Sequence, residues 1–311
     1  MSPEHFDVVI VGAGLSGIGA AYHLQRSPTY VVARPASDAV ANWLRQRLPA
    51  KLAYGLTRWK NVLTGMFYYR LSQKRPEAVK QRMVGGVQAA LGSDCDVAQH
   101  FTPAYKPWDQ RVCLVPDGDF FAAIRSGKAS VVTDQIACFT AIGIRLKSGA
   151  ELVADVVVSA TGLVLQVLGG LKLSVDGHAV DLTNTLNYKG MMYSEVPNLA
   201  SCLGYTNASW TLKVDLTSEY VCRLLNHLDQ QRLRQCTPRR TDPTLGEQPW
   251  THFSSGYVQR SLAQFPKHGS RTPWRLHQNY ARDLLSLRFS RLDDGEMVCS
   301  NPAPLPQRRA A

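Results

Sequence analysis

The residues with the clearest chemical use are three glycines near the start of the chain. They follow the spacing G-x-G-x-x-G and, with the residues between them, form the string Gly12, Ala13, Gly14, Leu15, Ser16, Gly17. In this spacing the first glycine allows a tight turn, the second lets the backbone approach a pyrophosphate, and the third lets a helix pack on a strand. The string predicts a dinucleotide site, although a glycine-rich turn without a ligand is the alternative that a lone motif leaves open.

The neighbouring segments supply the elements that such a site requires. The β-branched run from Phe6 to Val11 predicts a buried strand of the parallel type. The apolar segment from Ile18 to Leu24 predicts a helix whose N-terminus would offer N–H groups and a positive dipole to phosphate. Strand, glycine turn and helix in this order favour an α/β fold with a Rossmann-like sheet.

The second strand of a dinucleotide fold does not follow cleanly. The next β-branched run is Tyr30 to Ala33, so the place of the acid that would hold the ribose hydroxyls falls to Ala33 or Arg34. An arginine there would accommodate a 2′-phosphate and would favour NADP. The other interpretation is that the helix is too short and the unit is incomplete.

Composition describes an ordinary globular protein. The 311 residues are 45% hydrophobic and 19% charged, which excludes a disordered chain and allows about two domains or one large α/β domain. The seven cysteines include no C-x-x-C pair. We therefore expect reduced thiols in a cytoplasmic protein rather than a disulfide framework or a zinc ribbon.

The net charge of +11 would attract phosphates of any kind. Part of it lies in residues 57–91, which carry seven basic residues against Glu77 alone and are expected to form two helices after a first helix from Ala39 to Leu48. This stretch could contact membrane phosphates or nucleic acid, but a solvated helix face is the commoner explanation and no nucleic-acid motif is present.

Metal and hydrolytic chemistry find no support in the sequence. None of the eight histidines has a metal-ligand spacing, and no Ser/His/Asp or Cys/His arrangement presents itself. We therefore predict no metal site.

Two later segments are candidates for function. Residues 101–118 form a Pro-rich loop that is too long and too aromatic for a plain linker, and a β-meander follows and ends at Ala160-Thr161-Gly162. Residues 204–209 precede a helix whose apolar face is expected to contain Val214, Val221, Leu225 and Leu228. The start of this helix could bind an anion or could be an ordinary cap.

These strings together resemble the flavin-dependent Baeyer–Villiger monooxygenases. The resemblance rests on residues 7–17, on the loop 105–118 with Trp108-Asp109-Gln110-Arg111, on residues 154–162 and on residues 204–225. It implies a flavoprotein with two dinucleotide-binding domains, one for FAD and one for NADPH. The family has a glycine fingerprint in each domain, whereas this chain has one.

The resemblance also implies that an internal segment is missing. Residues 12–17 match the FAD fingerprint, whereas residues 25–30 match the end of the second strand of the NADPH domain, so two distant parts of the family sequence meet near Leu24. The implied divisions are 1–24 for the start of the FAD domain, 25–159 for the C-terminal part of the NADPH domain, and 160–311 for the rest of the FAD domain. Residues 301–311 read as a disordered tail.

Residue roles follow from the same resemblance. Arg111 matches the family arginine that sits over the flavin and stabilises the anionic peroxyflavin and NADP. Arg26 matches the residue that pairs with the 2′-phosphate of NADPH, for which a guanidinium is suited. The string Asn207, Ala208, Ser209 matches the place where a helix N-terminus meets the pyrimidine edge of the flavin.

The function implied is an FAD- and NADPH-dependent oxidoreductase that uses O2 to insert oxygen into ketones or to oxidise sulfur in sulfides and thioamides. The alternative is an internally deleted remnant with weak or no flavin binding. The expected partners are a small-molecule substrate and O2 without specific nucleic acid. The expected location is the cytoplasm, with weak peripheral contact at the inner face of the cell membrane through residues 57–91 as a further possibility.

Overall fold

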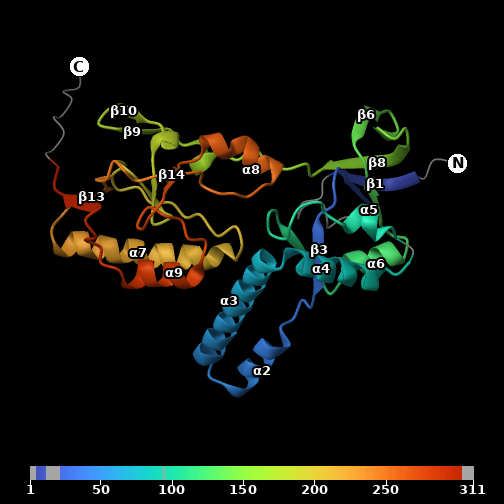
Figure 1. Ribbon diagram of the computed structural model, residues 1–311, viewed down its shortest axis with the longest axis horizontal. Helices are drawn as coiled ribbons and strands as arrows, with labels where there is room; N and C mark the ends of the chain where they lie inside the picture. Colours follow the sequence, from blue (N-terminus) through green and yellow to red (C-terminus); the bar gives the residue numbers. More distant parts are fainter. Residues whose placement is uncertain (1–4, 12–21, 94, 303–311) are drawn as a thin grey trace. The chain divides into compact units, whose positions relative to one another are not determined.

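The computed structural model describes residues 5–11, 22–93 and 95–302, and it divides the chain into two compact units. Residues 1–163 form unit 1 and residues 164–311 form unit 2 (Figure 1). The divisions expected at residues 24 and 159 concern the domains of the family, and they stay predictions.

Unit 1 is built on a six-stranded sheet with the strand order β5-β2-β1-β8-β7-β6. β1, β2, β5 and β8 are parallel to one another, whereas β7 runs antiparallel to both of its neighbours, β8 and β6. The strands are β1 (His5–Val11), β2 (Tyr22–Gln25), β5 (Ser130–Thr133), β6 (Ile136–Thr140), β7 (Gly143–Leu146) and β8 (Glu151–Ser159). The expected first strand, the β-meander and the α/β class are confirmed.

β2 corrects the expectation of a helix from Ile18 to Leu24. Residues 18–21 lie outside the described residues, but Tyr22–Gln25 is a strand that pairs with β1 and β5. His23, Leu24 and Gln25 are all at most 3% exposed, so both faces of the strand are buried, as is typical of an inner parallel strand. Burial in this sheet outweighs the helix preference of the segment.

A second, two-stranded parallel sheet pairs β3 (Tyr30–Arg34) with β4 (Val112–Pro116). The run from Tyr30 is thus a strand as expected, but β2 rather than β3 lies beside β1. β4 also corrects the expectation that residues 101–118 form a continuous loop. Alternate β4 residues, Cys113 and Val115, are each 1% exposed and join a core with Val31 and Phe121.

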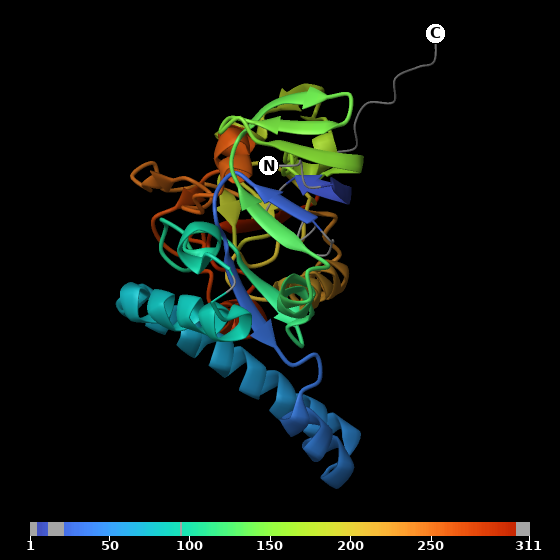
Figure 2. The ribbon, with the colours of Figure 1, turned by 90° about the vertical axis from the view of Figure 1, so that its right-hand side faces the viewer.

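The helices of unit 1 are α2 (Ala39–Arg47), α3 (Ala50–Lys74), α4 (Pro76–Leu91), α5 (Val97–Phe101) and α6 (Asp119–Arg125). Pro49 ends α2 and is the N-cap of α3, which therefore starts seven residues before the expected helix at Thr57. α2 and the first turns of α3 extend away from the sheet of this unit (Figure 1 and Figure 2). Trp43, Trp59 and Phe67 on these helices are 42–61% exposed.

Unit 2 is organised around the long helix α7 (Trp210–Gln230), with α9 (Tyr280–Leu284) beside it (Figure 1). The other helical segments are η1 (Val167–Gly170), η2 (Leu182–Asn184), α8 (Gly256–Ser261), η3 (Leu262–Gln264) and η4 (Leu285–Phe289). Four antiparallel strand pairs complete the unit: β9 (Leu173–Val175) with β10 (His178–Val180), β11 (Asn187–Tyr188) with β12 (Met192–Tyr193), β13 (Gln235–Pro238) with β16 (Met297–Ser300), and β14 (Glu247–Gln248) with β15 (His268–Gly269).

The buried face of α7 differs from the expected one. Leu225 is 59% exposed, and the buried stripe instead contains Lys213, Leu216, Thr217, Tyr220, Leu224 and Leu228. Of the four expected residues, Leu228 is buried at 7% exposed, whereas the other three each lie one position from a buried residue, because the expectation used only aliphatic side chains. The true stripe includes a tyrosine, a threonine and a lysine.

Candidate functional site

The glycine string 12–17 lies outside the described residues, but both strands that flank it are defined. β1 ends at Val11 and β2 begins at Tyr22, and Val11 is the register partner of Leu24. β1 has β2 on one side and the later strand β8 on the other. The chain leaves β1 where the strand order reverses, which is where open α/β sheets bind ligands.

Arg26 follows β2 at its carboxyl end and is exposed. The carboxyl ends of parallel neighbours lie at the same edge of a sheet, so Arg26 and the end of β1 share that edge. The structure therefore places an exposed guanidinium at the edge of the sheet that the glycine string follows.

Arg111 immediately precedes β4 and is half-buried. The loop before it is fixed to the β2–β3 turn through Tyr105: its hydroxyl lies 3.0 Å from Thr29 Oγ1, and its carbonyl oxygen accepts from the Tyr30 hydroxyl at 2.7 Å. Burial, with smaller contributions from nearby groups such as Tyr105, raises the pKa of Tyr30 to about 12, so this hydroxyl stays a donor.

Trp108 makes the second anchor of the loop. Its ring meets that of Tyr69 edge to face at 6.1 Å, and its φ of 71° lies in the left-handed region, which a non-glycine residue rarely adopts. Three residues later, the charge of Arg111 opposes the rise that burial causes in the pKa of Cys113. The loop that carries Arg111 is thus held in place by the contacts of Tyr105 and Trp108.

In unit 2, residues 207–209 lead directly into α7. Ser209 is the N-cap residue, but its hydroxyl pairs with Thr211 Oγ1 at 2.9 Å instead of capping the helix. Asn207 donates from Nδ2 to the carbonyl oxygen of Gln278 at 3.0 Å, and Ala208 is exposed. In the first turn, the N–H of Leu212 donates to the carbonyl oxygen of Ser209 at 3.3 Å. The N–H groups of Trp210 and Thr211 come before the first position that can bond within the helix, so this end of α7 presents donors and a positive dipole.

Gly204 is required by the close approach of Trp210. A Cβ at position 204 would lie 2.1 Å from Cγ of Trp210, which no real side chain tolerates. Thr206 is held from the other side, because its N–H donates to Oε1 of Gln278 at 3.0 Å. The segment before α7 is therefore fixed by packing and by hydrogen bonds.

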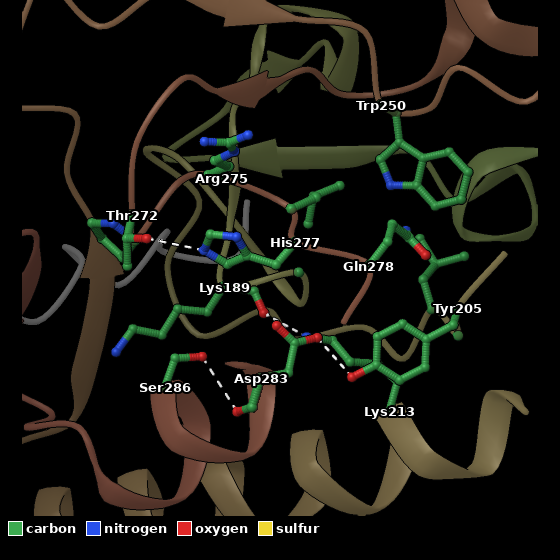
Figure 3. Close-up of a pocket in the computed structure, with 15 residues that line it drawn as sticks. Lys189, Tyr205, Lys213, Trp250, Thr272, Arg275, His277, Gln278, Asp283 and Ser286 are labelled. Atoms are coloured by element: carbon green, nitrogen blue, oxygen red, sulfur yellow. Dashed lines mark hydrogen bonds and ion pairs between the residues drawn. The ribbon is translucent and has the colours of Figure 1, made fainter. Parts of the chain in front are cut away.

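A pocket lies beside this segment, between α7 and the chain that leads into α9 (Figure 3). Its floor is a buried ion pair in which Lys213 Nζ lies 2.9 Å from Asp283 Oδ2, with the two side chains 7% and 8% exposed. Tyr205 donates its hydroxyl to the same carboxylate oxygen at 2.7 Å, and Lys213 also donates to the carbonyl oxygen of Lys189 at 3.2 Å. Burial, reinforced by Asp283, raises the pKa of Tyr205.

The pocket carries an excess of basic groups. Lys189, Lys213 and Arg275 line it with Asp283 as the acidic lining residue, and His277 adds an imidazole hydrogen-bonded to Thr272 Oγ1 at 3.1 Å. Burial lowers the pKa of His277, partly opposed by Asp283, which favours the neutral ring. Carboxylates pair with two of these cations, because Lys189 Nζ lies 3.1 Å from Asp294 Oδ2 and Lys213 pairs with Asp283.

Tyr205, Lys213 and Asp283 were not predicted as site residues from the sequence. One signal was present: Lys213 stands three residues before Leu216 and seven before Tyr220, so it lies on the buried stripe of α7. A lysine on a buried helix face needs an acidic partner, which points to a buried pair or a site.

Within residues 5–11, 22–93 and 95–302, every helix is too short or too polar to span a membrane. No group of three or more His, Cys, Asp or Glu side chains in the same residues is placed to hold a metal ion.

Comparison with known proteins finds relatives of this chain among FAD-containing and FAD-binding monooxygenases. No family model matches the chain. It is 48% identical to FAD-containing monooxygenase EthA of Mycobacterium tuberculosis over 97% of this chain and 65% of that protein. It is 46% identical to probable FAD-binding monooxygenase AlmA of Acinetobacter baylyi over 94% of this chain and 62% of that protein.

Solved structures with a similar fold are also monooxygenases. A steroid monooxygenase bound to NADP superposes with a TM-score of 0.60 at 15% identity, covering 95% of this chain and 67% of that one. The chain spans just under two thirds of the length of EthA, which is consistent with the missing segment that the resemblance implied. The chain is therefore a homologue of the FAD-containing monooxygenases and shares the fold of the Baeyer–Villiger monooxygenases.

Proposed function

We propose that this protein is an FAD- and NADPH-dependent monooxygenase of the Baeyer–Villiger type. Its reaction would insert one atom of O2 into a ketone or add it to the sulfur of a sulfide or thioamide. The observation that carries the proposal is 48% identity to EthA across 97% of the chain, which includes both units. In this proposal residues 1–24 and 160–311 belong to the FAD domain, and residues 25–159 belong to the NADPH domain.

The start of α7 fits the pyrimidine edge of a flavin. Ser209 Oγ pairs with Thr211 Oγ1, so it leaves the N–H groups of Trp210 and Thr211 for an external acceptor. Asn207 ties the backbone beside that helix end to Gln278, Ala208 is exposed there, and the positive end of α7 favours negative charge on a bound ring. The string Gly12 to Gly17 would hold the pyrophosphate, as its spacing predicts. When bound, FAD supplies the activation of O2.

Arg111 is the proposed catalytic residue. A guanidinium carries a permanent charge and five N–H donors, so it can stabilise an oxyanion that develops during the reaction. The anchors at Tyr105 and Trp108 hold its loop in place before the substrate arrives. This preorganisation is what makes an electrostatic contribution effective.

Arg26 is the proposed contact for the 2′-phosphate of NADPH. Its exposure and its place at the carboxyl end of β2 suit an ion pair with a phosphate that arrives from solvent. In this assignment it is a binding residue and takes no part in oxygen transfer.

We also propose weak peripheral contact of the basic helices with the anionic inner face of the cell membrane, for a protein that otherwise resides in the cytoplasm. Trp59 and Phe67 on α3 are 42% and 61% exposed among arginines and lysines, and aromatic side chains with basic neighbours suit a headgroup layer. Sedimentation with phosphatidylserine vesicles at low salt tests this. Equal binding to neutral vesicles, or none, would contradict it.

The experiment for the main proposal is the visible absorption spectrum after incubation with FAD and desalting. Retained flavin bands that bleach on addition of NADPH are expected. A protein that stays colourless would instead support the deleted remnant, and bands that do not bleach would separate FAD binding from NADPH use. A variant with Gly14→Asp places a carboxylate where the pyrophosphate must approach, so it should lose the bands, and Gly65→Ala on α3 is the matched control.

A further inference from the structure

Two cysteines face each other across the strand pair β13–β16. Cys236 and Cys299 are register partners in this antiparallel sheet. Antiparallel partners alternate between pairs that exchange backbone hydrogen bonds and pairs that do not. Arg239 donates its backbone N–H to the carbonyl oxygen of Glu296, so residues 239 and 296 form a hydrogen-bonded pair. Cys236 and Cys299 lie three positions further along the strands, so they form a pair that exchanges no backbone hydrogen bonds.

The backbone of Cys236 supports the same assignment independently. Its N–H donates to Oδ1 of Asn198 at 2.9 Å, and its carbonyl oxygen accepts from the N–H of Asn198 at 2.9 Å. Both groups thus point away from β16. In such pairs the two Cα atoms are about 4.5 Å apart, and a disulfide requires about 4.4–6.8 Å. The Cα spacing typical of such a pair therefore lies within the range that a disulfide requires.

Both thiols are free, and they differ in exposure. Cys236 is 3% exposed and Cys299 is half-buried, so Cys299 is the one that meets an oxidant from solvent. Burial, together with the neighbouring Cys299, raises the pKa of Cys236 to about 11, and burial also raises the pKa of Cys299. Thiols held protonated in this way resist weak oxidants and remain reduced in the resting protein.

We propose that Cys236 and Cys299 are a redox-sensitive pair that closes to a disulfide on exposure to hydrogen peroxide. The sulfur of Cys299 attacks one peroxide oxygen and the O–O bond breaks, giving a sulfenic acid and one water. The sulfur of Cys236 then attacks the sulfenic sulfur, the S–S bond forms, and the second water leaves with the thiol proton. Two thiols are oxidised and one peroxide is reduced to two waters.

The disulfide would act on the pocket of unit 2. The segment between the two cysteines supplies Trp250, Arg275, Gln278 and Asp283 to the pocket. A covalent link across β13–β16 joins the two ends of this segment and restricts its opening. Closing a loop of this length removes conformational freedom from the unfolded chain, so the oxidised protein should melt at a temperature about 5–15 °C higher.

The test is peptide mapping of the intact protein after graded exposure to hydrogen peroxide, alkylation and trypsin digestion without reductant. The expected product links the peptide 235–239 to the peptide 292–308 and is lighter than their sum by two hydrogen atoms. Dithiothreitol should reverse this link, and the exposed residues Cys138, Cys202 and Cys222 should take no part in it. The readout does not require FAD, so it can fail or succeed separately from the proposed function.

Variants make the result decisive. Cys299→Ser should abolish both the linked peptide and the rise in melting temperature, whereas Cys222→Ser on α7 should change neither. If Cys299→Ser fails to fold, Cys236→Ala serves in its place. Oxidation of the exposed cysteines without the 236–299 link, or an unchanged temperature rise in Cys299→Ser, would overturn the proposal.

Discussion

Replacing Lys213 by methionine removes the cation from the buried ion pair with Asp283. Both side chains are less than one tenth exposed, so the carboxylate would stay buried with Tyr205 as its remaining donor. Removing one partner of a buried pair costs about 3–5 kcal/mol. For a unit of this size each kcal/mol corresponds to about 2–4 °C, so we expect a fall in melting temperature of about 6–20 °C.

A matched control separates burial from mere charge. Arg288 pairs with Glu219 through two hydrogen bonds, but the two side chains are 46% and 41% exposed. Solvent screens such a pair, so Arg288→Met should cost at most about 1 kcal/mol. Thermal unfolding followed by circular dichroism measures both variants under the same conditions.

A double variant tests the cause of the loss. Adding Asp283→Asn to Lys213→Met removes the unpaired charge and keeps an amide oxygen that can accept from Tyr205. We therefore expect the double variant to be more stable than Lys213→Met alone. Two results would show that the buried pair does not stabilise unit 2 as described. In the first, Lys213→Met is no less stable than Arg288→Met. In the second, the double variant loses as much stability as the sum of the losses measured for Lys213→Met and Asp283→Asn alone.

Three further predictions concern other positions. Gly204→Ala should cost about 1–3 kcal/mol, because its Cβ would overlap Trp210, whereas Gly65→Ala, with open space at the Cβ on α3, should gain about 0.5–1 kcal/mol; urea unfolding compares them. Burial lowers the pKa of His268 below 6.5, so its contribution to stability is complete above that pH and is lost as the pH falls. The fall in melting temperature between about pH 7.5 and about pH 5.5 should therefore be smaller in His268→Gln than in the unmodified protein. An equal fall in both proteins would contradict this. Arg111→Lys should reduce the NADPH-dependent rate of product formation about 100-fold while FAD retention stays unchanged, and loss of the flavin would point to a structural role.

Much of the fold could be predicted because local patterns and tertiary burial agree there. The β-branched run of β1 and the meander into β8 were expected where they occur. The strand β2 was not predicted, because the residues Tyr22–Gln25 carry little strand preference of their own. Their strand is imposed by pairing with β1 and β5, which no local pattern reports.

The site was predictable only in part, for a similar reason. Resemblance pointed to Arg26, Arg111 and residues 207–209, but it did not point to the ion pair of Lys213 and Asp283. These two residues are 70 positions apart in the chain, and only the packing of α9 against α7 brings them together. Long-range polar pairs of this kind leave one local trace, which is a charged residue on an apolar helix face.

In the proposed function, this chain transfers one atom of O2 to a small molecule at the expense of NADPH. The most direct measurement supplies ¹⁸O2, FAD and NADPH with a simple sulfide or ketone and analyses the product by mass spectrometry. We predict that one ¹⁸O atom enters each product molecule and that one NADPH is consumed for each. Oxidation of NADPH without labelled product, or labelled product that forms equally in Arg111→Ala, would contradict the account.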